Sequence, residues 1–69
     1  MCSMQIVVNG EVRQESEPLS VAALLEALAM EPRRVAIELN RQILPRARYG
    51  ETMLGQDDRL EIVTLVGGG

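Results

Sequence analysis

The sequence predicts an α+β domain in which a mixed sheet of four to five strands packs against one helix. Three features of the 69-residue chain support this fold class. An Asn9-Gly10 pair separates two runs of β-type residues, a single apolar face at helical spacing follows, and alternating apolar residues return in the second half. If the last strand lies beside the first, the two strands must run parallel, with the helix in the connection between them.

A β-hairpin is predicted at the beginning of the chain. Residues 4–8 are rich in β-forming side chains, and Asn9-Gly10 suits a type I′ turn, which needs a positive φ at both central residues. The partner strand, residues 11–15, is mostly charged. Charges on an edge strand discourage pairing with other chains, so this strand is expected at an edge of the sheet.

A single helix is predicted to begin after Ser20, whose hydroxyl can accept a hydrogen bond from a free backbone N–H of the first turn. Its apolar residues recur at spacings of three and four, which places them on one face: Val21, Leu24, Leu25 and Leu28. Pro32 disfavours helical geometry at the residue before it, so the helix is expected to end near residue 29 or 30.

The second half of the chain is predicted to return to the sheet. Residues 35–39 alternate between apolar and other side chains, and a short strand follows at 42–44. Residues 46–54 are expected to be irregular or briefly helical, and 55–58 form a turn. The last strand, residues 60–65, alternates again and continues directly into the glycines.

Two groups of apolar side chains follow from this assignment. The expected helix–sheet core contains Ile6, Leu24, Leu28, Ile37 and Ile62. A second group lies on the opposite face of the sheet, because neighbouring residues of a strand point to opposite faces. Its expected members are Val7, Val63 and Leu65, and we predict that they form a small exposed patch near the tail that docks a partner.

Composition and charge exclude several classes of function. The formal net charge is −3, which argues against non-specific nucleic-acid binding. The chain has no His and a single Cys, so a His-based triad, a His metal site and a Cys-rich zinc site are excluded. Asp57-Asp58 fits turn chemistry better than cation binding. We therefore expect no metal site, no cofactor and no catalytic constellation in the chain itself.

The expected location is the cytoplasm. No run of residues approaches the ~18 apolar side chains of a membrane span. The first residues lack the charged and apolar regions of a signal peptide. The lone Cys2 cannot form an internal disulfide, which fits a reducing compartment.

The sequence Gly67-Gly68-Gly69 is the candidate active feature. Residues 1–66 are expected to form the domain and residues 67–69 a flexible tail, because glycine loses much conformational entropy when it is ordered. A string without side chains can enter a narrow channel and deliver the carboxylate of Gly69 to a partner. That carboxylate is ionised at neutral pH and is a poor electrophile, so reaction with a sulfur nucleophile requires prior activation, such as adenylation.

Ordered segments of the sequence resemble a known family. The run from Met4 to Val8 resembles the first strand of ubiquitin. The chain also ends in Gly-Gly, as ubiquitin does. A more specific resemblance is to the ThiS family. It rests on the ordered segments Val35-Ala36-Ile37-Glu38-Leu39-Asn40, Ile43-Leu44-Pro45-Arg46, Leu54, Leu60-Glu61-Ile62-Val63 and the terminal glycines. The resemblance extends from Met4 to Gly69 and departs at Gln56-Asp57-Asp58, where the family usually has Asp-Gly-Asp.

The resemblance implies a β-grasp, ubiquitin-like fold and a role in making the thiazole of thiamine. In such a system an ATP-dependent activating enzyme adenylates the carboxylate of Gly69, and a cysteine-desulfurase relay supplies sulfur that converts it to a thiocarboxylate. Thiazole synthase then takes the sulfur. The chain is expected to be a protein co-substrate that these partners act on.

Two rival functions share the fold and the tail. The small subunit of molybdopterin synthase is usually longer and tends to carry prolines and aromatic residues before its glycines, whereas Thr64-Leu65-Val66 precedes them here. A ubiquitin-like modifier would attach Gly69 to lysines of target proteins. A binding module with an inert tail is a third possibility, and the sequence leaves all of these open.

Overall fold

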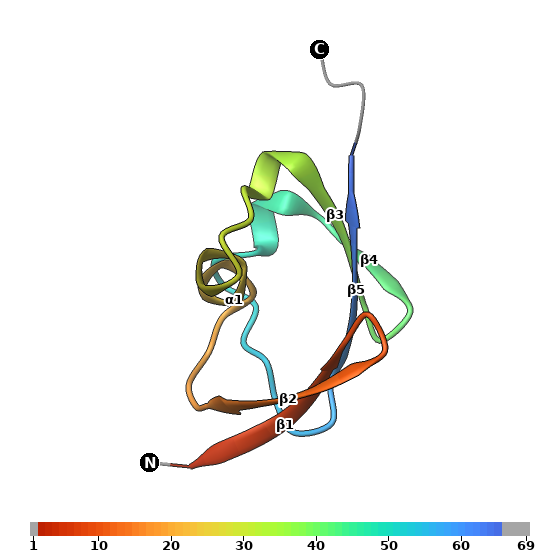
Figure 1. The fold of residues 1–69 in the computed structure, drawn as a ribbon. Helices are drawn as coiled ribbons and strands as arrows, with labels where there is room; N and C mark the ends of the chain where they lie inside the picture. The colour runs from red at the N-terminus through yellow and green to blue at the C-terminus, as the bar shows by residue number, and fades with distance from the viewer. Residues whose placement is uncertain (1, 66–69) are drawn as a thin grey trace.

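The computed structural model describes residues 2–65, within which five strands form one sheet and a helix covers one of its faces (Figure 1). The elements are β1 (Ser3–Val8), β2 (Glu11–Ser16), α1 (Val21–Ala27), β3 (Val35–Leu39), β4 (Gln42–Leu44) and β5 (Arg59–Thr64). Two short 3₁₀ turns, η1 (Pro32–Arg34) and η2 (Arg46–Arg48), lie in the connections. The predicted α+β class and the predicted order of elements are confirmed.

The strand order is β2-β1-β5-β3-β4, so the last strand of the chain lies at the centre of the sheet. β5 runs parallel to β1 and antiparallel to β3. The charged β2 lies at one edge, as its composition predicts. The strand that the glycines follow in the sequence is thus the central strand of the sheet.

The helix begins at the predicted cap and ends earlier than predicted. The hydroxyl of Ser20 accepts a hydrogen bond from the backbone N–H of Ala23 at 3.0 Å. The last helical residue is Ala27, followed by a left-handed Ala29 with φ of 58°. The N–H of Met30 donates to the carbonyl of Leu25, and the N–H of Ala29 donates to that of Glu26. This pair of bonds is a Schellman motif. The helix is therefore ended by this motif and not by the geometry that Pro32 imposes.

Replacing Ala29 by glycine is expected to stabilise the protein by about 1 kcal/mol. The left-handed position of a Schellman motif favours glycine, because a Cβ atom is crowded there. The free energy of unfolding of Ala29→Gly should be measured by urea titration against the parent chain. Ala27→Gly is the matched control, since it places the same residue at the last position with right-handed helical geometry and should destabilise by about 0.5–1 kcal/mol. A loss of stability in Ala29→Gly would contradict this account of the helix end.

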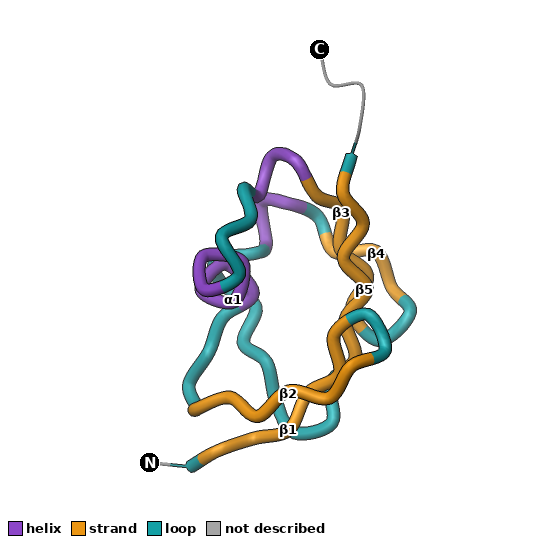
Figure 2. The backbone as a smooth tube through the Cα atoms, viewed as in Figure 1, coloured by secondary structure: helices purple, strands orange, loops and turns teal. Residues whose placement is uncertain are grey.

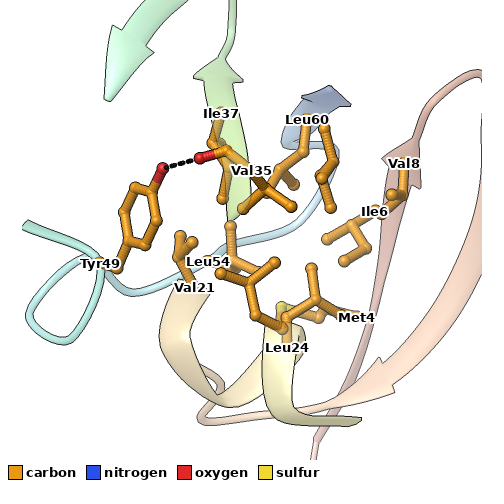
Figure 3. Close-up of a cluster of buried hydrophobic side chains, with 12 residues drawn as sticks. Met4, Ile6, Val8, Val21, Leu24, Val35, Ile37, Tyr49, Leu54 and Leu60 are labelled. Atoms are coloured by element: carbon orange, nitrogen blue, oxygen red, sulfur yellow. Dashed lines mark hydrogen bonds between the residues drawn. The ribbon is translucent and has the colours of Figure 1, made fainter. Parts of the chain in front are cut away.

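The core lies between α1 and the inner face of the sheet (Figure 3). Four of the five predicted core residues are buried: Ile6, Leu24, Ile37 and Ile62. The fifth, Leu28, is only partly buried, and Leu25 is fully buried. Leu28 forms the C-cap of the helix, at its margin, whereas Leu25 lies one turn inside. The sole aromatic residue, Tyr49, closes one side of the core and donates from its hydroxyl to the carbonyl of Val35 at 3.5 Å.

The turn that departs from the family pattern is held by its own side chains. Asp57 has a left-handed φ of 69°, and one carboxylate oxygen of Asp58 accepts from the N–H of Gly55 at 2.8 Å. The backbone carbonyl of Asp58 accepts from the N–H of Val7 at 2.9 Å. These bonds fix the start of β5 against β1, so the predicted turn persists with aspartate in place of glycine.

Candidate functional site

The candidate site is the C-terminal end of β5 and the sheet surface around it. β5 ends at Thr64, and the N–H of Leu65 donates to the carbonyl of Arg34 at 2.7 Å. The tail residues Gly67, Gly68 and Gly69 lie outside the described residues. The structure therefore defines the strand that leads to them and the surface from which they depart.

The two faces of β5 differ as predicted. Leu60 and Ile62 are buried beneath α1, and Val63 is 56% exposed on the outer face. Leu65 continues the outer face and is 49% exposed. Ala36 of β3 pairs with Val63 of β5 and is also exposed. We refer to Ala36, Val63 and Leu65 as the tail-proximal patch.

The third predicted patch residue, Val7, belongs to a different part of the outer face. Strand pairing places Val7 opposite Arg59 of β5 and opposite Val12 of β2. Val63 lies four residues after Arg59, about 13 Å further along the strand. The register of β1 against β5 thus separates Val7 from the tail. Val7 instead forms a pair with Val12, which is 60% exposed, and the single predicted patch is two separate groups.

Charged residues adjoin the tail-proximal patch on the outer face of the sheet. Glu38 of β3 lies directly opposite Glu61 of β5, and Ile43 of β4 lies opposite Glu38. Like charges at facing positions of a sheet destabilise it slightly. Ile43 is 80% exposed. Alternation within each strand places Ile43, Glu38 and Glu61 on the outer face. Only the pairing between strands shows that they are neighbours there.

A shallow hollow of about 350 Å³ lies on the other side of the end of β5. Its lining residues come from the segment after the helix, from η1, from β3 and from β5: Ala29, Met30, Glu31, Arg34, Val35 and Thr64. Thr64 lines this hollow, whereas its neighbours Val63 and Leu65 belong to the tail-proximal patch on the opposite face. A partner that encloses the end of β5 can therefore contact both faces of the sheet.

The described part of the chain lacks the features of a metal site and of a membrane span. Residues 2–65 contain no group of three His, Cys, Asp or Glu side chains placed to hold a metal ion. Cys2 is exposed and free. No helix among these residues is long and apolar enough to cross a membrane.

A family model and several known proteins are similar to this chain. A family model described as the ThiS family matches residues 5–69. The sulfur carrier protein ThiS of Bacillus subtilis is 35% identical over 63 residues, which are 90% of this chain and 96% of the relative. A thiazole synthase of Paramagnetospirillum magneticum is 42% identical over 66 residues, which are 96% of this chain but only 20% of that protein.

A solved structure agrees in fold. The crystal structure of the thiamine biosynthesis protein ThiS from Geobacter metallireducens superposes with a TM-score of 0.82 at 33% identity, covering 96% of this chain and 100% of that one. The five-stranded mixed sheet on one helix is thus the β-grasp fold that the resemblance implies. The family model, the relatives and the superposition lead to one conclusion: this chain belongs to the ThiS family.

Proposed function

We propose that this chain is a sulfur carrier for the synthesis of the thiazole of thiamine, and that it carries sulfur as a thiocarboxylate on Gly69. The observation that carries the proposal is the family match over residues 5–69, which includes the glycine tail together with the folded body. The central position of β5 supports it, because a tail that continues from the middle of a sheet starts from a rigid base. The match also favours the thiazole route over the molybdopterin route.

The proposed chemistry proceeds in two steps. It uses sulfur at the sulfide level, so persulfide sulfur from the relay first needs two electrons from a thiol, which becomes a disulfide. A carboxylate oxygen of Gly69 attacks the α-phosphorus of ATP, pyrophosphate leaves, and the acyl carbon becomes electrophilic. Sulfide-level sulfur then attacks that carbon, the bond to AMP breaks, and the thiocarboxylate remains. Transfer of this sulfur to the thiazole precursor, in exchange for an oxygen atom from that precursor or from water, restores the carboxylate. The chain is a co-substrate in this cycle, and its partners provide the catalytic groups.

Three partners follow from this proposal. An ATP-dependent activating enzyme adenylates Gly69, a cysteine-desulfurase relay supplies the sulfur, and thiazole synthase receives it. The relative named thiazole synthase supports the last of these, since one fifth of that protein is 42% identical to this chain. Two proteins that work together are often also joined in one polypeptide, where the effective concentration of one for the other is high.

The test of the proposed function is the mass of the intact protein. The chain is incubated with the activating enzyme of a ThiS system, ATP and sulfide, and a reaction without ATP is the control. The expected result is the mass change of one oxygen-to-sulfur exchange at the C-terminal peptide, only with ATP. Isopeptide linkage of Gly69 to lysines would support the modifier function instead. An unchanged mass with an active enzyme would show that the sulfur-carrier proposal is wrong.

We further propose that the activating enzyme docks on the tail-proximal patch. Val63 and Leu65 are exposed apolar side chains on the strand that carries the tail, and exposed apolar groups of this kind are typical of interaction sites. The facing carboxylates Glu38 and Glu61 adjoin the patch, so the matching surface of the enzyme should be apolar with basic groups beside it.

Val63→Glu is expected to weaken binding to the activating enzyme by about tenfold or more, because a charge would be buried against an apolar partner. Val12→Glu is the matched control: it is the same substitution on the same face, and the two valines are 56% and 60% exposed. Both variants should fold, and Val12→Glu should bind within about twofold of the parent in calorimetry. Equal loss of affinity in both variants would show that docking is not confined to the tail-proximal patch.

A further inference from the structure

The backbone of β1 leaves the sheet before β5 ends. The last paired residues of the two strands are Val8 and Leu60, and β5 continues to Thr64. At Asn9 the chain turns away into the hairpin, with φ of 51° at Asn9 and 83° at Gly10. Figure 2 shows this turn beside β5. β5 would thus lose its neighbour on this side over its last residues, just before the tail.

The side chain of Asn9 takes the place of the missing strand. The N–H of Asn9 still donates to the carbonyl of Leu60 at 2.9 Å, as in a regular parallel ladder. The side-chain oxygen Oδ1 of Asn9 then accepts from the N–H of Ile62 at 2.7 Å, where a continuing strand would offer the carbonyl of residue 9. Its Nδ2 donates to the carbonyl of Ile62 at 3.2 Å, where that strand would offer the N–H of residue 11.

We propose that Asn9 is a positioning residue for the tail: its side-chain amide holds β5 at Ile62 from the β1 side and thereby fixes the direction in which this strand leads toward a partner's active site. This inference rests on the proposed function. Seven residues follow Ile62 in the chain. At up to ~3.5 Å per residue they reach a defined distance only if their starting point is fixed. On its other side β5 pairs with β3 as far as Thr64, and the N–H of Leu65 donates to the carbonyl of Arg34. Without the Asn9 bonds the end of β5 would be held from that side alone, and its direction would vary.

The requirement for asparagine has two physical parts. Asparagine is one of the few residues that adopts a left-handed φ at low cost, which the type I′ turn needs. Its amide also offers one acceptor and one donor, as a peptide group does. Glycine meets the first requirement and not the second. Aspartate meets the first and half of the second, because it accepts but cannot donate.

The chain provides a matched control for this test. Asn40 occupies the β3–β4 turn with φ of 52°, nearly the same as Asn9. Its side chain also makes two bonds, accepting from the N–H of Arg59 and donating to a carboxylate oxygen of Asp58, both at 3.0 Å. These bonds hold the first residue of β5, at the end of the strand remote from the tail. Asn40→Gly therefore removes equivalent interactions without freeing the tail.

The experiment compares Asn9→Gly, Asn9→Asp and Asn40→Gly with the parent chain in thiocarboxylate formation by the activating enzyme, with ATP and sulfide. Asn9→Gly should lower kcat about ten- to a hundredfold with little change in KM for the carrier, because the bound tail is less often in line for attack. Asn9→Asp should fall between Asn9→Gly and the parent. Asn40→Gly should keep the parent kcat. A merely structural role would instead raise the apparent KM, since partial unfolding reduces the concentration of folded carrier.

Amide hydrogen exchange gives a readout that needs no partner. The N–H of Ile62 should exchange about tenfold faster or more in Asn9→Gly and at the parent rate in Asn40→Gly. If the parent is modified and Asn9→Gly has the same kcat as Asn40→Gly, the positioning role is wrong and the proposed function stands. If the parent itself gains no sulfur from an active enzyme, the proposed function is wrong and the positioning role falls with it.

Discussion

Deletion of Gly69 is expected to abolish thiocarboxylate formation while leaving the fold intact. The deletion withdraws the terminal carboxylate by up to ~3.5 Å, and a misplacement of about 1 Å can cost a reaction a hundredfold. The core is unaffected, because it is formed by buried residues between Met4 and Ile62. We expect a loss of more than a hundredfold in the rate at which the activating enzyme converts the chain, measured by the mass of the intact protein.

Adding one alanine after Gly69 is the matched variant for this deletion. It moves the carboxylate in the opposite direction and places a methyl group in the channel, so it should also fail. Circular dichroism and thermal unfolding of both variants should match the parent. If either variant accepts sulfur at the parent rate, the carboxylate does not need a fixed distance from the folded body, and the mechanism proposed for Gly69 is wrong.

Truncating Leu24 to alanine is expected to lower the free energy of unfolding by about 2–5 kcal/mol. Leu24 is fully buried between α1 and the sheet, so its removal leaves a cavity among well-packed neighbours. Domains of this size have stabilities at the lower end of the usual 5–15 kcal/mol, and the variant should be near the limit of folding. Urea unfolding followed by circular dichroism measures the change.

Leu28→Ala is the control, since the same substitution at the partly buried helix end should cost clearly less. The slope of the unfolding free energy against urea should be unchanged in both variants, which would show that the unfolded state is the same. An equal loss in Leu24→Ala and Leu28→Ala would mean that the helix packs in a different rotation from the one described.

Local signals in the sequence were sufficient for the type and order of the helix and strands. Asn9-Gly10 predicts the hairpin because a type I′ turn needs residues that tolerate a positive φ, and Ser20 predicts the helix start because it caps free N–H groups. Alternation alone predicts which side chains of β5 are buried. These signals act over a few residues, so each can be interpreted without knowledge of the rest of the chain.

The tertiary structure decided what depends on segments that are distant in the sequence. The register of β1 against β5 separates Val7 from Val63, and periodicity within a strand does not specify register between strands. The end of the helix at Ala27 is the exception: its bonds are local, but an alanine at position 29 gives no sign of a left-handed residue. The bonds from the Asn9 side chain to Ile62 span 53 residues. The sequence by itself thus determined the order of the elements, the family and the presence of the glycine tail. Only the packed sheet determined how β5 is held at Ile62, because the relative positions of two strands depend on tertiary packing and not on local sequence.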